Sequence, residues 1–158
     1  MLEIERKFLV KKLPTLDESS KVIYERYFVS DDPNNQIRIQ RKNSIYEIEA
    51  KKRVGNNYEK AKTPISKEDF AKLTKDCKQS IKRISYKIPG FKNATLKVYD
   101  GQFTGLIRAE FEFSNDKDAK GFTPPDWVGK EITNSVLGLD AKLIKLTKAE
   151  FLKELQGF

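Results

Sequence analysis

The sequence predicts a mainly β fold of the α+β class, an eight-stranded antiparallel β-barrel tunnel with covering helices. Three observations predict it. Apolar and charged residues alternate through most of the chain, the alternating runs are short and bounded by turn residues, and two helical segments each carry an apolar stripe. No change in composition and no linker divides the 158 residues, so we expect residues 1–158 to form a single domain.

The predicted strands are runs in which one parity is apolar and the other is charged. In the first ten residues Leu2, Ile4 and Phe8 share one parity, whereas Glu3, Glu5 and Lys7 share the other. Similar runs lie at 22–29, 36–42, 45–53, 56–63, 81–88, 94–100 and 105–113. Most are joined by short segments rich in glycine, asparagine, serine or proline, which indicates hairpins between neighbouring strands.

Two helices are predicted from their N-terminal signals. Ser66 and Thr147 are each followed three residues later by an acidic residue and then by an apolar stripe, which predicts helices over 66–79 and 147–157. We expect Cys77 to pack on the first of these helices. Shorter helices are expected at 13–20 and within 137–146, the latter inside the least regular stretch of the chain, 121–146.

The charged parity of the strands has two interpretations. In the commoner one, it is the solvated face of an open sheet. In the other, it lines the inside of a barrel, and the apolar parity is covered by helices on the outside. Buried charges of both signs then need partners, which a polyanion and metal cations would supply. The two amphipathic helices favour this second interpretation.

Composition limits the ligands. The chain has 31 basic and 23 acidic residues, a formal net charge of +8, which favours anionic partners. Aromatic residues do not interleave with lysines, as they do in platforms that stack bases, so we do not expect nucleic acid to be the partner. The chain has no histidine, and Cys77 is its only cysteine, so a metal would be held by oxygen, as magnesium, manganese and calcium are.

The first residues, MLEIERKFLV, carry charges at every second or third position, unlike a signal peptide. No apolar run reaches the length of a membrane span. We therefore expect a cytoplasmic protein that has no membrane partner.

Several segments resemble one known family. The opening LEIERKFLV contains the pattern Glu-x-Glu-x-Lys and resembles the signature of the CYTH superfamily, the triphosphate tunnel metalloenzymes. The segments QIRIQ, EIEAKK, GLIRAEFEF and PPDWVGKEIT resemble later parts of the same family in the same order, and the resemblance spans residues 1–133. Among bacterial members it is greatest to short inorganic triphosphatases that open with EIERKF.

The resemblance implies a tunnel in which basic residues bind a triphosphate while glutamates hold Mg2+ or Mn2+. It implies a catalytic group of Glu5, Lys7 and Glu112. The implied metal ligands are Glu3, Glu5, Glu59, Glu110, Glu112 and Glu131. The expected phosphate contacts are Lys7, Arg38, Lys51 and Arg83, to which strand parity adds Lys97 and Arg108.

The function that follows is metal-dependent hydrolysis of a small-molecule triphosphate, with inorganic tripolyphosphate as the expected substrate. Two alternatives remain open: a class IV-type adenylate cyclase or another nucleotide or thiamine triphosphate enzyme, and a non-catalytic protein that binds polyphosphate or nucleotides. Departures from the family pattern at Gln40, Ala61, Ser85 and Lys97 leave catalysis and the number of metals open. The sequence does not fix the oligomeric state, and a homodimer remains open.

Overall fold

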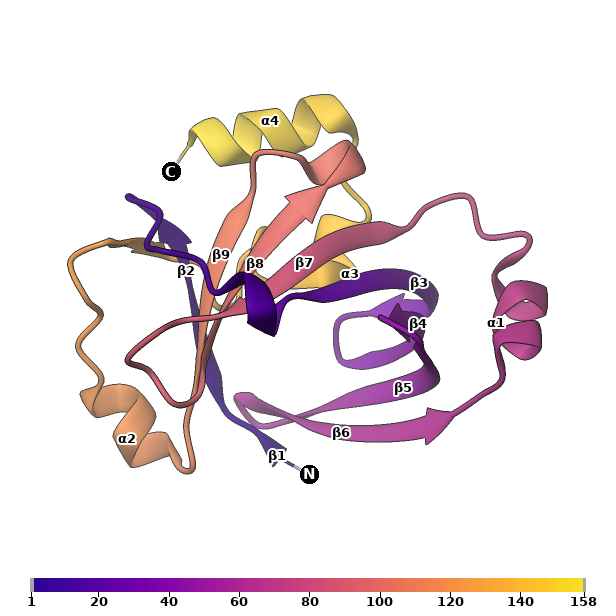
Figure 1. Ribbon diagram of the computed structural model, residues 1–158, viewed down its shortest axis with the longest axis horizontal. Coiled ribbons are helices and arrows are strands. Elements are labelled where there is room, and N and C mark those ends of the chain that lie inside the picture. Colours follow the sequence, from indigo (N-terminus) through magenta and orange to yellow (C-terminus); the bar gives the residue numbers. More distant parts are fainter. Residues whose placement is uncertain (1, 158) are drawn as a thin grey trace.

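The computed structural model describes residues 2–157, apart from the side chain of Asp31 (Figure 1). Over this range, ten strands form one antiparallel sheet in the order β1-β6-β5-β4-β3-β7-β8-β9-β2-β10. The strands are β1 (Leu2–Glu3), β2 (Glu5–Val10), β3 (Val22–Asp32), β4 (Asn35–Lys42), β5 (Ile45–Val54), β6 (Asn57–Pro64), β7 (Ile81–Lys87), β8 (Ala94–Asp100), β9 (Ile107–Glu112) and β10 (Val128–Glu131). The predicted mainly β fold is confirmed.

The N-terminal segment brings the two ends of this sheet together. Residue Ile4 interrupts the predicted first strand, so β1 pairs with β6 at one end of the sheet while β2 pairs with β9 near the other. The sheet therefore curls round on itself, as Figure 1 shows, although its hydrogen-bonded order is not a closed ring. The strand count is ten instead of eight because of this interruption and because residues 128–131 add β10 beside β2.

The apolar parity of the strands lies on the outside of the curled sheet. Phe8, Leu96, Ala109 and Phe111 form one buried core there. Aromatic side chains pack over it, with ring centroids 5.9 Å apart for Phe8 and Phe111. Helix α2 (Asp116–Gly121), which was not predicted, and the segment after it cover this face. The inside-out interpretation of the alternation is therefore the correct one.

A second core lies under the C-terminal helices α3 (Asp140–Leu143) and α4 (Lys148–Gln156). It joins Ile81 and Tyr99 from β7 and β8 to Leu137, Leu143 and Phe151. Ile81 and Tyr99 have the same parity in their strands as the inward-facing Arg83 and Lys97, so this core packs against the inner face of the sheet. The C-terminal segment thus occupies part of the space that the sheet encloses.

The helices are shorter than predicted. Ser66 and Thr147 both cap their helices as expected, and the second forms a full capping box with Glu150. However, α1 (Lys67–Thr74) ends five residues early, because the residues after Thr74 are mainly polar and offer no stripe to bury. Cys77 therefore lies beyond the helix, half-buried. The predicted helix at 13–20 is only a 3-10 turn, η1 (Glu18–Ser20), and another such turn, η2 (Gly101–Phe103), follows β8.

Among residues 2–157, none of the helices has both the length and the apolar character that a membrane crossing requires.

Candidate functional site

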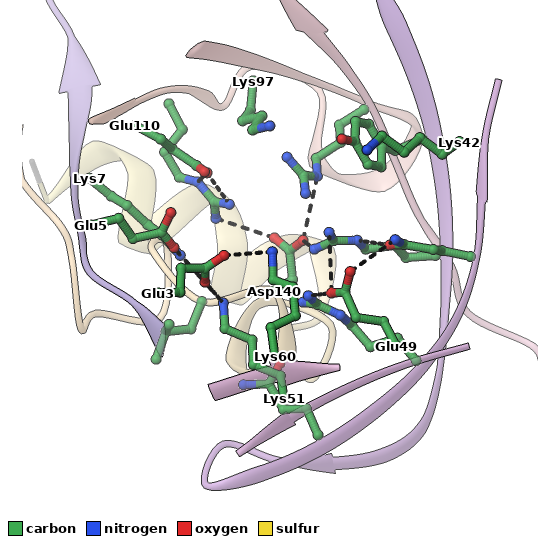
Figure 2. A pocket seen from close by; sticks show the side chains of 18 of the residues that line it. Glu3, Glu5, Lys7, Lys42, Glu49, Lys51, Lys60, Lys97, Glu110 and Asp140 are labelled. Carbon is green, nitrogen blue, oxygen red and sulfur yellow. Dashed lines mark hydrogen bonds and ion pairs between the residues drawn. The ribbon is translucent and has the colours of Figure 1, made fainter. Parts of the chain in front are cut away.

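The curled sheet encloses a cavity of about 190 Å3 whose walls are almost entirely charged, here named the charged cavity (Figure 2). Among the residues that the structure describes, ten basic and six acidic side chains line it, a formal excess of four positive charges. The basic ones are Lys7, Arg26, Arg38, Lys42, Lys51, Lys60, Lys62, Arg83, Lys97 and Arg108, and the acidic ones are Glu3, Glu5, Glu49, Glu110, Glu112 and Asp140. Such a cavity is suited to a polyanion accompanied by cations.

The alternation of side chains along each strand places most of these residues in the cavity wall. On each strand, every second residue points inward, so residues two apart, such as Glu5 and Lys7 on β2, enter the cavity together. The structure brings ten of the twelve sequence-predicted site residues into the lining: Glu3, Glu5, Lys7, Arg38, Lys51, Arg83, Lys97, Arg108, Glu110 and Glu112.

Three carboxylates gather where the N-terminal segment meets β9. Glu3, Glu5 and Glu112 each offer one oxygen, and these oxygens lie within 4.8 Å of one another. Burial and repulsion by Glu5 and Glu3 raise the pKa of Glu112. Oxygen ligands at this spacing fit a hard divalent cation such as Mg2+ or Mn2+.

Lysines neutralise part of this carboxylate group. The ammonium of Lys51 lies 2.7 Å from Glu3 Oε1, and that of Lys60 lies 2.5 Å from Glu3 Oε2. Lys7 lies 3.0 Å from Glu5 and donates a hydrogen bond to the carbonyl of Gly138 at 2.9 Å. Burial opposes ionisation of Glu3, but the two lysines outweigh it and hold its pKa below the ordinary value.

Arginines dominate another part of the cavity, and some of their donors have no partner. Arg38 forms a buried ion pair with Glu49. Arg26 donates a hydrogen bond to Gln40 at 2.8 Å, and Gln40 in turn donates to Glu49. By contrast, Nε of Arg38 and both Nε and Nη1 of Arg83 are buried without a hydrogen-bond acceptor among the described atoms. Buried donors are seldom left unsatisfied, so these atoms are available to an oxygen acceptor in the cavity.

Lys97 is a further buried basic residue of the cavity, and its ammonium has three N–H donors. Its ammonium donates a hydrogen bond to Ser85 Oγ at 3.0 Å and lies 5.2 Å from the ring centroid of Tyr24. Burial lowers the pKa of Lys97 to about 7, and repulsion by Arg83 acts in the same direction. Between about pH 7 and the ordinary lysine value of 10.5, the folded protein therefore holds fewer protons than the unfolded chain. The contribution of Lys97 to stability consequently rises with pH across that range.

A bound polyphosphate should restore the proton on Lys97, because a nearby negative charge favours the ammonium form. At pH 8 we expect tripolyphosphate binding to take up more protons in the parent protein than in Lys97→Met, by up to about one proton per site. Titration calorimetry in two buffers of different ionisation enthalpy measures this difference. Equal proton uptake by the two proteins would show that phosphate does not reach Lys97.

The even-numbered side chains of β6 face the cavity, whereas the sequence predicted that the odd-numbered ones, such as Glu59, would do so. Residue pairing across the two-residue loop at Gly55 and Asn56 places Lys60 opposite Lys51 and Lys62 opposite Glu49. Lys60 and Lys62 therefore line the cavity, whereas Glu59 is exposed on the opposite face. The length of this loop predicts which face of β6 points inward, because a two-residue hairpin pairs odd-numbered residues of one strand with even-numbered residues of the next.

Besides Glu59, two more of the expected metal ligands lie apart from the carboxylate group. Glu131, on β10, is outside the cavity lining and forms an ion pair with Arg6 at 2.6 Å. Glu110 does line the cavity, but it pairs with Arg108 at 2.6 Å and is not part of the group formed by Glu3, Glu5 and Glu112.

The sequence analysis missed other lining residues. Tyr24 and Arg26 enter from β3, where charges occur on both parities and alternation cannot choose a face. Asp140 enters from α3, inside the stretch that showed no regular pattern. No local signal identifies Asp140, because only the folding of the C-terminal segment into the curled sheet brings it to the cavity.

Comparison with known proteins adds to this geometry. No family model matches the chain. The inorganic triphosphatase of Nitrosomonas europaea is 28% identical over 136 residues, which cover 84% of this chain and 90% of that protein.

Solved structures show the same fold. The crystal structure of the inorganic triphosphatase NE1496 superposes with a TM-score of 0.67 at 24% identity, covering 90% of this chain and 93% of that one. A Bacillus halodurans protein with a provisional adenylate cyclase name has a TM-score of 0.58 at 14% identity, covering 75% of this chain and 84% of that one. In its opening motif and its fold, the chain resembles the CYTH superfamily of triphosphate tunnel metalloenzymes.

Proposed function

We propose that the protein is a metal-dependent triphosphatase that hydrolyses inorganic tripolyphosphate in the charged cavity. The observation that carries this proposal is the division of the lining into two parts. Three carboxylates with oxygens within 4.8 Å of one another occupy one part, and arginines with unsatisfied buried donors occupy the other. The first part suits a divalent cation and the second suits phosphate oxygens. The similarity to a named inorganic triphosphatase supports the same substrate.

In this proposal, the acidic and the basic residues of the cavity have different roles. Glu3, Glu5 and Glu112 would hold Mg2+ or Mn2+, whereas Glu110, two residues before Glu112 on β9, pairs with Arg108. A bound divalent cation supplies charge neutralisation at the phosphate oxygens and a lowered pKa for water. The phosphate chain is held by Lys7, Arg38, Lys51, Arg83, Lys97 and Arg108, to which the structure adds Arg26. Arginine contributes paired donors in a fixed plane, and lysine contributes a compact charge.

The reaction is transfer of the terminal phosphoryl group to water. A water oxygen bonds to the terminal phosphorus, the bond from that phosphorus to the bridging oxygen breaks, and the water protons pass to the phosphate products and to solvent, giving phosphate and diphosphate. Such a transition state spreads negative charge over the phosphoryl oxygens, so fixed cations around them lower the barrier. Lys7 is well placed for this, because its contacts with Glu5 and Gly138 fix its ammonium beside the carboxylates.

A second substrate class has one structural feature in its favour. A cavity of about 400 Å3 adjoins the charged cavity and shares Glu3, Lys60, Lys62 and Glu112 with it. Its other lining residues are apolar: Leu2, Ile4 and Phe113. An organic group attached to a triphosphate would find apolar contacts there, so ATP and thiamine triphosphate belong in the same assay. If the protein releases phosphate faster from ATP or thiamine triphosphate than from tripolyphosphate, the faster compound becomes the proposed substrate.

Binding is the first requirement of the proposal. Tripolyphosphate should raise the melting temperature of the protein, because a ligand that binds only the folded state stabilises it by mass action. Relief of repulsion among the inward cations should add to this shift. The control is sodium chloride at the same ionic strength. No shift at saturating tripolyphosphate with metal would contradict the proposal.

A further inference from the structure

Asp140 lies at the centre of the charged cavity in Figure 2, although it belongs to the C-terminal helix α3 and not to the sheet. Its carboxylate is almost fully buried, with 1% of the side chain exposed. The strands around it contribute arginines, and none of the three carboxylates proposed to hold metal is among its contacts. Asp140 is therefore a separate acidic element of the site.

One carboxylate joins three arginines from three strands. Nη1 of Arg26, on β3, donates to Asp140 Oδ2 at 2.7 Å, and Nη1 of Arg108, on β9, donates to Oδ1 at 3.2 Å. Nε of Arg83, on β7, lies 3.5 Å from Oδ2, within ion-pair distance but without a hydrogen bond. The dashed lines in Figure 2 show these contacts converging on the carboxylate.

Other contacts fix the carboxylate itself. The hydroxyl of Tyr99 donates to Oδ1 at 2.6 Å, and the backbone of α3 is anchored by the fully buried Leu143. Burial opposes ionisation, but the three arginines hold the pKa of Asp140 well below its usual range. The arginines therefore favour the ionised form of Asp140, and its contacts with Tyr99, Arg26 and Arg108 hold the carboxylate in place.

We propose that Asp140 is a positioning residue, a built-in counter-anion that orients Arg26, Arg83 and Arg108 and limits the affinity of the charged cavity for polyphosphate. The inference rests on the proposed function in taking polyphosphate as the ligand. Without an anion, three buried guanidinium groups would repel one another. Asp140 satisfies some of their donors and leaves others, those of Arg83 in particular, for the ligand.

The loss of one negative charge determines the direction in which Asp140→Asn should change the affinity for tripolyphosphate. Asp140→Asn keeps the size of the side chain and an oxygen for Tyr99, but removes one negative charge from a cavity of low dielectric constant. The arginines then repel one another in the free protein and attract a polyanion more strongly. We expect a lower melting temperature without ligand, a larger rise on addition of tripolyphosphate, and a dissociation constant at least about threefold lower than that of the parent.

The experiment is titration calorimetry of tripolyphosphate without metal, together with melting curves, on the full-length protein. Calorimetry counts the competent sites, so irreversibly unfolded protein lowers the stoichiometry and leaves the dissociation constant unchanged, and titration well below the melting temperature of each variant keeps reversible unfolding from raising it. Leu143→Ala is the matched control, because it weakens the packing of α3 without touching the arginines. It should lower the melting temperature with and without ligand alike, and its dissociation constant should equal that of the parent.

An unchanged or higher dissociation constant in Asp140→Asn would overturn the inference. Asp140→Glu keeps the charge and should stay within about threefold of the parent affinity. If Asp140→Asn does not fold alone, tripolyphosphate in the refolding buffer should recover it by supplying the missing anion, and failure to do so would also overturn the inference. Parent protein that binds tripolyphosphate without hydrolysing it would contradict the proposed function and leave this inference standing.

Discussion

Replacing Glu5 with glutamine should lower metal-dependent phosphate release from tripolyphosphate by about a hundredfold or more. The substitution keeps the shape of the side chain and removes one of the three carboxylates whose oxygens lie within 4.8 Å of one another. A hard cation loses a charged ligand, whereas the arginines are untouched. Tripolyphosphate binding without metal should therefore survive or become tighter, because one source of repulsion has gone. Initial rates and titration calorimetry measure the two effects separately.

Glu154→Gln is the control for this change. It makes the same substitution at an exposed carboxylate on α4, outside the charged cavity. Its rate should match that of the parent. If Glu5→Gln retains the parent rate, or if its metal-free binding weakens as much as its rate falls, the division of tasks between carboxylates and basic residues is wrong.

Arg38→Ala should instead weaken binding. Arg38 is 3% exposed, lines the charged cavity and has a buried donor without an acceptor. Loss of a charge-assisted contact costs about 1.5–3 kcal/mol, which corresponds to about a 10- to 150-fold rise in the dissociation constant for tripolyphosphate. The variant should also melt at a lower temperature, because the buried Glu49 loses the nearest of its ion-pair partners.

Arg41→Ala is the matched control, since Arg41 is on the same strand and does not line the cavity. Its dissociation constant should equal that of the parent, whereas Arg38→Lys, which keeps the charge without the planar donors, should be intermediate. Equal weakening in Arg38→Ala and Arg41→Ala would mean that net charge, and not the geometry of the cavity, governs binding.

Periodicity predicts the parts of the site that lie on strands with clean alternation. On β9 one parity is charged and the other apolar, and on β2 and β4 one parity is mainly polar or charged while Arg6 and Arg41 are the charged exceptions on the other, so the inward faces that carry Glu5, Arg38 and Glu110 can be assigned from the sequence. On β3, alternation fails, because within residues 22–30 each parity is mainly apolar and carries a single charge, Glu25 on one and Arg26 on the other. Arg26 could not be placed for this reason.

Other features depend on long-range contacts that a local pattern does not contain. The exposure of Glu59 reflects the register across a two-residue loop, and an analysis of hairpin pairing would have assigned it correctly. Asp140 reaches the cavity only because apolar residues of the C-terminal segment, such as Leu137 and Phe151, bury themselves against the sheet. Burial of those residues brings Asp140 to the cavity, where its contacts with Tyr99 and the arginines then hold the carboxylate.

The most direct test of the account is phosphate release from tripolyphosphate by the unmodified protein, with magnesium, with manganese and with a chelator. The account predicts release that depends on the divalent cation and stops when the chelator is added. Release at background level with either metal, from a folded sample whose melting temperature tripolyphosphate raises, would contradict it and leave a protein that binds polyphosphate without hydrolysing it.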